Sequence, residues 1–135
     1  MEIIFFLWQL PQNIFGFILS RLEKAFKRNE FGIKYYATKT PGKLMKNCAI
    51  SLGEFIIVDA YTSDEQTIRH EHGHQKQSRI LGPLYLLVIG IPSAIGNFID
   101  RVFHKKWNDA KRLKWYYNLP WEHWADKLGK VDRKI

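Results

Sequence analysis

The sequence predicts a mostly helical α+β protein with a small antiparallel sheet in its first half. Short runs of strand-forming residues lie between residues 31 and 60, whereas helix starts, helix-spaced apolar residues and helix stops follow from residue 62 onward. At 135 residues the chain has room for one domain with one modest core. We therefore expect a single domain over residues 1–135, with a hydrophobic N-terminal part over residues 1–30 and a core over residues 31–130.

The N-terminal part is expected to form hydrophobic or amphipathic helices. Residues 3–22 are strongly apolar, and four basic residues follow between Arg21 and Arg28. Pro11 and Gly16 interrupt the apolar run, which leaves two alternatives open. One is a straight bilayer-spanning helix, and the other is a short helix, a break and a second amphipathic helix from about Pro11 to Arg28. The second arrangement would lie in the membrane surface or form a face that binds a partner.

The antiparallel sheet is expected to precede the longest soluble helix. Its strand-like runs cover residues 34–38, 48–52 and 54–60, separated by a Pro-Gly turn and by Gly53. The last run is our candidate for an edge strand that binds an extended substrate through its main chain, and a strand that only builds the core is the alternative. The residues of this candidate edge are Glu54, Phe55, Ile56, Ile57 and Val58.

Three helices are expected in the second half of the chain. The first begins at Ser63 as the N-cap, followed by Gln66 and acidic residues in the first turn, and ends near residues 81–83. The second covers residues 83–100 without a charge before Asp100, and is either a short kinked membrane helix or a fully buried core helix. The third begins at Pro120 and ends near residue 128, before Gly129.

Residues 70–74 read His-Glu-His-Gly-His, which contains the pattern HExxH. On a helix His70 and His74 share one face and can bind a single metal ion, and Glu122 on the last helix could supply a third ligand. Zinc with two imidazoles and one carboxylate keeps a position open for water and lowers its pKa from about 15.7 toward 7. Glu71 would accept the proton of that water and later return it to the leaving amine. His72 is half a turn away and is not expected to be a ligand.

Residues around these ligands have expected supporting roles. Gly73 allows another element, either the helix of Glu122 or the sheet, to approach the HExxH helix closely. Asp126 lies one turn after Glu122 and could accept the free N–H of a ligating histidine. Gln77 and Ser78 are candidates for a similar role or for substrate contact, and the alternative is that they only form a polar edge of the helix. The candidates for stabilising a developing oxyanion are Tyr116, Tyr117 and His123.

The pattern His70-Glu71-x-x-His74 followed by Glu122-x-x-Ala125-Asp126 resembles the glutamate-zincin (gluzincin) metallopeptidases. It is most similar to their integral-membrane branch, which includes prenyl-protein and heat-shock membrane proteases. The resemblance implies a minimal zincin-like domain in which His70, His74 and Glu122 bind Zn²⁺ and Glu71 is the base. Residues 65–130 are also similar to a set of small bacterial membrane-associated proteins, which implies no particular substrate. The chain is far shorter than the large membrane proteases, so their enclosed chamber is not implied.

Charge and apolar content indicate the partners. A formal net charge of +8 favours anionic surfaces, and lipid ranks above nucleic acid because the basic residues flank apolar runs and no nucleic-acid motif is present. The basic residues after the first apolar run favour a membrane-associated protein, interfacial or integral, with its site on the cytoplasmic side. Two functions stay open: a membrane-associated zinc endopeptidase that hydrolyses peptides or proteins, and a non-catalytic basic membrane-binding module with a structural or vestigial zinc site. The sequence does not indicate an oligomeric state.

Overall fold

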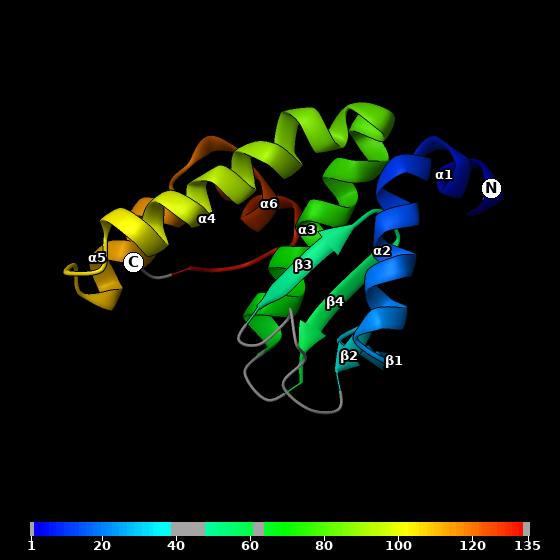
Figure 1. Ribbon diagram of the computed structural model, residues 1–135, viewed down its shortest axis with the longest axis horizontal. Helices are drawn as coiled ribbons and strands as arrows, with labels where there is room; N and C mark the ends of the chain where they lie inside the picture. The colour runs from blue at the N-terminus through cyan, green and yellow to red at the C-terminus, as the bar shows by residue number, and fades with distance from the viewer. Residues whose placement is uncertain (1, 39–47, 61–63, 134–135) are drawn as a thin grey trace.

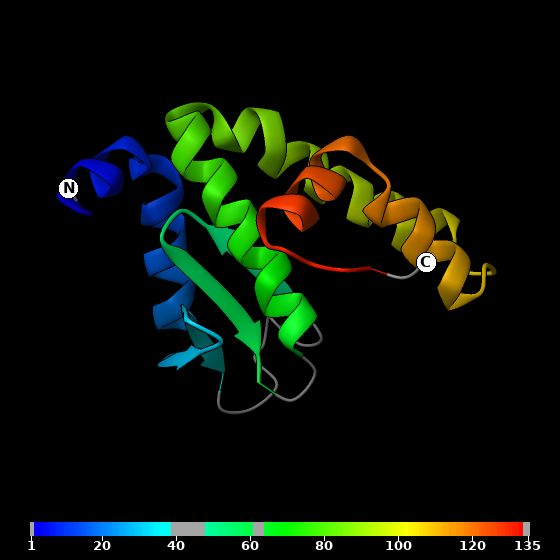
Figure 2. The same cartoon turned by 180° about the vertical axis from the view of Figure 1, so that it is seen from behind.

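The computed structural model describes residues 2–38, 48–60 and 64–133. Over these residues it contains a four-stranded sheet and six α-helices, which confirms the α+β prediction. The sheet lies between two helices, with α3 (Glu65–Leu81) on one face and α2 (Leu10–Leu22) on the other (Figures 1 and 2). The helices that follow α3 in the chain extend to its far side, so that α3 contacts both the sheet and the C-terminal helix α6 (Pro120–Leu128) (Figure 2).

The sheet consists of two hairpins. Strands β1 (Phe26–Glu30) and β2 (Ile33–Thr38) pair antiparallel, as do β3 (Ala49–Leu52) and β4 (Phe55–Asp59). A parallel pairing of β2 with β4 joins the hairpins in the order β1-β2-β4-β3. The sheet is therefore mixed, and the antiparallel prediction holds only within each hairpin. The local pattern of apolar residues does not fix the direction in which two hairpins meet, because a long connection permits either direction.

The prediction that residues 54–58 form an edge of the sheet is wrong. Strand β4, which contains Phe55, Ile56, Ile57 and Val58 after Glu54, lies between β2 and β3 and is paired on both sides. Ile56, Ile57 and Val58 are fully buried because the strand is also covered on both faces. Of the described strands, β3 and β1 form the two edges of the sheet.

The core lies between the sheet and α3. Alternate residues of β2, namely Ile33, Tyr35 and Ala37, point to the same face and pack with Ile56 and Val58 of β4. Ile68 of α3 joins them. This contact fixes the orientation of α3, and with it the direction in which the histidines of the next turn point.

The helices differ from their predicted limits at several ends. Helix α1 (Glu2–Trp8) precedes α2 after a break, as one of the two alternatives predicted, but α2 ends at Leu22 because the chain continues as strand β1. Ser63 lies outside the described residues, and the N-cap of α3 is Asp64, whose side chain accepts a hydrogen bond from the backbone N–H of Thr67. Beyond α3, the 3₁₀ turn η1 (Gly82–Leu84) and the π-helical segment η2 (Leu86–Gly90) continue into α4 (Ile91–Phe103). Helix α5 (Asp109–Tyr117) then leads to α6.

The hydrophobic stretch predicted over residues 83–100 is helical but is not a buried core helix. Only 11% of the window Leu86–Phe103 is buried, and this stretch is long and apolar enough to cross a membrane by length and composition. One side of it nevertheless faces the protein, because α4 lies along α5 and α6 (Figure 1).

Candidate metal centre

Helices α3 and α6 cross in close contact at two glycines. A Cβ atom on Gly73 would overlap the carbonyl oxygen of Ala125, and a Cβ on Gly129 would overlap that of Arg69. Glycine is required at both positions because the two backbones touch there. The predicted close approach of another element at Gly73 is thus confirmed, and that element is α6 rather than the sheet.

This contact brings three ligand atoms together. The Nε2 atom of His70 lies 2.9 Å from Oε2 of Glu122, and the Nε2 atom of His74 lies 3.0 Å from the same oxygen. The three side chains are buried, and one ligand atom from each lies within 4.8 Å of the others. His74 and Glu122 are 48 residues apart in the chain. The group could hold a metal ion.

The other nitrogen of each imidazole is fixed by a hydrogen bond. The Nδ1 atom of His70 lies 2.7 Å from Oδ1 of Asp126, and the Nδ1 atom of His74 lies 2.7 Å from Oε1 of Gln77. Gln77 donates its Nε2 to the carbonyl of Trp121, which orients its amide oxygen toward His74. Because carboxylate and amide oxygens only accept, Nδ1 donates in both rings. Each Nε2 faces the Glu122 oxygen, and a metal that binds there would replace any proton that Nε2 shares with this carboxylate.

Asp126 is itself held by a residue near the end of the described chain. The Arg133 guanidinium donates to both carboxylate oxygens of Asp126, at 2.8 and 3.0 Å. It also lies over the ring of Tyr117, 3.4 Å from the centroid, and Tyr117 packs edge-on against His70. The imidazole of His70 is therefore confined by an acceptor, a cation and an aromatic ring.

The second oxygen of Glu122 is bound by α4. The hydroxyl of Ser93 donates to Oε1 of Glu122 and lies 3.3 Å from the hydroxyl of Tyr116. Gly96 on the same helix faces Leu119, where a Cβ would come within 2.9 Å of its side chain. Helix α4 therefore positions the carboxylate ligand as well as covering it.

Burial and charge shift the acidities in this group. Burial alone would lower the pKa of His70, but hydrogen bonds with Asp126 and Glu122 raise it to about 9. Burial alone would raise the pKa of Glu122, but the hydrogen bonds from the two histidines hold it far below its ordinary value. Burial also raises the pKa of Glu71, against the attraction of His74 and His70. Glu122 is thus an ionised carboxylate that could bind a metal, whereas Glu71 is a more basic carboxylate beside it.

A cleft of about 550 Å³ opens beside the metal group. It lies between α3, α4, α5 and the start of β3, and its lining includes His70, Glu71, Tyr116, Tyr117, Ala49 and Cys48. Burial raises the pKa of both tyrosine hydroxyls, that of Tyr117 to about 12, so each keeps its proton at neutral pH and can donate a hydrogen bond.

The edge of β3 faces this cleft. The Asp59 N–H donates to the Cys48 carbonyl, so the antiparallel alternation directs the main-chain groups of Ala49 and Ser51 away from β4. The Tyr85 hydroxyl donates a hydrogen bond to the Ser51 carbonyl at 3.3 Å, so this carbonyl already has a partner. Within the described residues β3 pairs only with β4, which leaves the N–H and C=O of Ala49 directed toward the cleft.

Of Asp126 and the three residues predicted to stabilise an oxyanion, three lie near the candidate metal group and one lies away from it. Tyr116, Tyr117 and Asp126 lie beside the ligands, whereas His123 is exposed and does not line the cleft, because it is one residue and about 100° around α6 from Glu122. Ser93 and Arg133 were not identified from the sequence. Ser93 could have been identified as a polar residue within an uncharged run. That signal points to Glu122 only if α4 is known to pack on α6.

Compared with protein-family models, with curated proteins and with solved structures, the chain matches none of them. The class of the protein therefore follows from its own residues. It is an α+β protein with a buried group of two histidines and one glutamate that is able to bind a metal and lies beside an open cleft.

Proposed function

We propose that the protein is a membrane-associated zinc metallopeptidase. The observation that carries the proposal is the convergence of His70 Nε2, His74 Nε2 and one Glu122 oxygen beside a cleft that His70 and Glu71 line. Two imidazoles and one carboxylate are a donor set of catalytic zinc sites, which need three protein ligands and an open position. In the described part of the chain, the group has three members and no fourth.

The spacing of the three atoms suits zinc. Bonds of about 2.0–2.2 Å in a tetrahedral set place neighbouring ligand atoms roughly 3.3–3.6 Å apart, and the two nitrogens lie 2.9 and 3.0 Å from the carboxylate oxygen, so zinc would bind after these atoms separate by a few tenths of an ångström. The fixed Nδ1 atoms make the ring orientation independent of the ion. When bound, zinc would lower the pKa of water toward about 7 and polarise the substrate carbonyl.

The residues of the chain have distinct roles in hydrolysis. Glu71, with its raised pKa, accepts the proton of the attacking water and passes it to the leaving amine. Tyr116 or Tyr117 donates a hydrogen bond to the oxygen that becomes negative as the carbonyl is attacked. An extended peptide pairs with the free main-chain groups of Ala49, which places its backbone along β3. This moves the role first assigned to β4 to the neighbouring strand.

The membrane association rests on the helix that covers the site. Helix α4 and the segment before it have an apolar outer side, and Ser93, Asn97 and Asp100 on the inner side face the ligands or the cleft. A helix with these two sides can lie in the bilayer surface with the cleft beneath it, on the cytoplasmic face of the membrane. The exposed residues of its outer side are Leu87, Val88, Ile91, Ile95, Phe98 and Val102.

The test compares zinc content and hydrolysis of labelled casein in four purified proteins: wild type, Glu71→Gln, Glu122→Ala and His72→Ala. We expect about one zinc per chain in wild type and Glu71→Gln, with hydrolysis by Glu71→Gln reduced at least 100-fold, because a general base contributes roughly 10²–10⁴-fold. Glu122→Ala should lose zinc and hydrolysis together, and His72→Ala, on the opposite side of α3, should keep both.

Equal rates for wild type and Glu71→Gln would contradict the proposal. In that case the protein would be the non-catalytic membrane-binding module, and binding to anionic vesicles that weakens steeply with salt would be its remaining activity.

A further inference from the structure

Helix α2 has its polar side toward the protein and its apolar side toward the outside. Its buried residues are Gln12, Asn13, Gly16 and Ser20. The large apolar side chains between them are exposed, Phe15 by 57% and Phe17 by 49%. A helix on a water-soluble protein has the opposite arrangement. The medium around the outer side of α2 is therefore expected to be apolar.

The polar side of α2 is fixed by specific hydrogen bonds. Gln12 donates through Nε2 to the hydroxyl of Ser78 and to the carbonyl of Gly82, both at 2.8 Å. Asn13 accepts from the backbone N–H of Glu54 at 2.7 Å and donates to the carbonyl of Phe6. Turning the helix over would leave these buried groups unpaired, at a cost of about 1–3 kcal/mol each. The outward direction of the apolar side is thus built into the fold.

Helix α1 extends this apolar surface. Its exposed residues include Ile3, Ile4 and Leu7. The Trp8 indole donates to the carbonyl of Arg79 and packs against Gly82, where a Cβ would overlap the ring. This contact anchors α1 to the end of α3. We call the outer sides of α1 and α2 the apolar flank.

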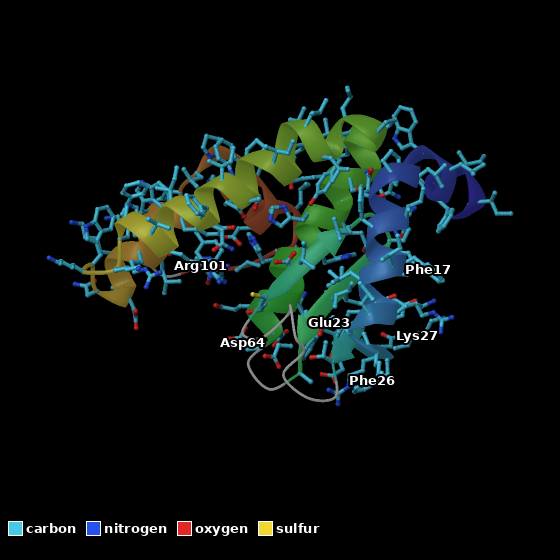
Figure 3. All side chains as sticks on the ribbon, in the orientation of Figure 1. Phe17, Glu23, Phe26, Lys27, Asp64 and Arg101 are labelled. Carbon is cyan, nitrogen blue, oxygen red and sulfur yellow. The ribbon has the colours of Figure 1, made fainter. Side chains whose placement is uncertain are left out.

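A groove of about 920 Å³ adjoins the apolar flank. Phe5 and Phe6 of α1 line one part of it, and Lys27, Arg28 and Lys34 of the first hairpin line another. Lys27 is opposite Tyr36 and Lys34 opposite Asn29, so the two lysines lie on one face of the hairpin. Figure 3 shows Lys27 projecting on the same side of the molecule as Phe17 of α2.

The groove is strongly positive. Among the described residues that line it, Glu54 is the one carboxylate, and the Arg79 guanidinium binds both of its oxygens, at 3.1 and 2.8 Å. Lys27 and Lys34 have no salt bridge within the described residues. A ligand that fills this groove must be anionic at the hairpin and apolar at α1.

We propose that the apolar flank and this groove bind anionic phospholipid of a bilayer. The acyl chains contact α1 and α2, and the phosphate binds Lys27 and Lys34, which share one face of the hairpin. A second copy of the chain fits less well, because a symmetric dimer through the flank would bring two basic grooves close together in a protein of net charge +8. The proposal refines the membrane association proposed above and does not depend on the metal chemistry.

The test measures sedimentation with vesicles of phosphatidylcholine alone or mixed with phosphatidylglycerol. We expect wild type to prefer the anionic vesicles, and Lys27→Gln/Lys34→Gln to bind them roughly 30-fold more weakly, since each lysine near an anionic surface contributes about a factor of five. The matched control Lys127→Gln/Lys130→Gln removes the same charge at the end of α6, outside the apolar flank, the groove and α4, and should change the affinity less than threefold. Phe15→Gln/Phe17→Gln should weaken binding to both kinds of vesicle.

Three results would overturn the proposal: equal losses for the two lysine pairs, unchanged binding of the phenylalanine variant, or release of the protein by millimolar inorganic phosphate at constant ionic strength. A dimer that forms without lipid and prevents vesicle binding would show that a second copy covers the flank. Zinc content is measured on every variant. Normal zinc with lost lipid binding separates this proposal from the peptidase proposal.

Discussion

The two imidazoles of the metal centre are held by different kinds of acceptor. Nδ1 of His70 donates to the charged Asp126, which Arg133 also binds, whereas Nδ1 of His74 donates to the neutral amide of Gln77. A charged acceptor makes the opposite ring nitrogen a stronger donor to a metal than a neutral acceptor does. Asp126 is therefore the support on which metal affinity should depend most.

Replacing Asp126 by Asn tests this dependence. Asn keeps an acceptor oxygen but removes the charge, so zinc affinity is expected to fall about 10–100-fold while the three ligands stay in place. Competition with a chromophoric chelator measures the change. Asp132→Asn, an exposed substitution nearby, serves as the control and should alter the affinity less than twofold. An Asp126→Asn protein with wild-type affinity would show that Asp126 does not support the ligand.

At this scale the sequence predicted the three residues that could hold a metal, but not all of their neighbours. His70, His74 and Glu122 follow from a helical repeat and a known spacing of residue types, and the structure places their ligand atoms together. Ser93 and Arg133 belong to an uncharged run and to the segment after the last helix, and neither has a spacing that relates it to the ligands. Their contacts arise only when α4 and the C-terminal segment pack against α6.

Among the elements, the crossing of α3 and α6 determines whether the metal centre forms. Gly73→Ala introduces a methyl group against the backbone carbonyl of Ala125. We expect a net destabilisation of roughly 1–3 kcal/mol from overpacking, although alanine favours a helix by about 1 kcal/mol. Zinc affinity should fall as the helices separate. Thermal unfolding and zinc titration measure both effects.

Gly90→Ala is the matched control for this substitution. It lies in a helical segment, and its Cβ would come closest to the flexible side chain of Leu86, at 3.2 Å, with the Tyr85 carbonyl oxygen at an ordinary contact distance of 3.8 Å. The melting temperature should therefore stay within a few degrees of wild type. Equal behaviour of the two alanine variants would mean that the helix crossing does not need a glycine at residue 73.

The strands show which elements a sequence pattern can predict. The runs that became β2, β3 and β4 are rich in branched and aromatic residues, and were predicted. Strand β1 reads Phe-Lys-Arg-Asn-Glu and has no such pattern. It forms because Phe31 and Gly32, both with positive φ, make a tight turn that returns the chain along β2. The order of the strands, and hence which of them is an edge, depends on contacts between hairpins and not on either hairpin alone.

For the whole molecule, a bound metal would connect distant parts of the chain. His70 and Glu122 are 52 residues apart, and they belong to two helices whose backbones touch at Gly73 and Gly129. Zinc that binds only the folded state should stabilise it by about 2.7 kcal/mol at a free concentration 100 times the Kd. The melting temperature should rise with zinc and fall with chelator. His74→Ala should remove the zinc dependence, and a zinc effect that persists in this variant would place the ion elsewhere.

The polar side of α2 also has a consequence for the nascent chain. Gln12 binds Ser78 and Gly82, which lie 66 and 70 residues further along the chain. The ribosome therefore releases the N-terminal helices well before these partners are synthesised. During that interval only water can form hydrogen bonds with the side-chain amides of Gln12 and Asn13. The phenylalanines on the other side of α2 already favour an apolar environment. The headgroup layer of a bilayer offers both at once, and the hydrocarbon interior does not. The N-terminal helices are therefore suited to wait at the headgroup layer until the rest of the protein is made.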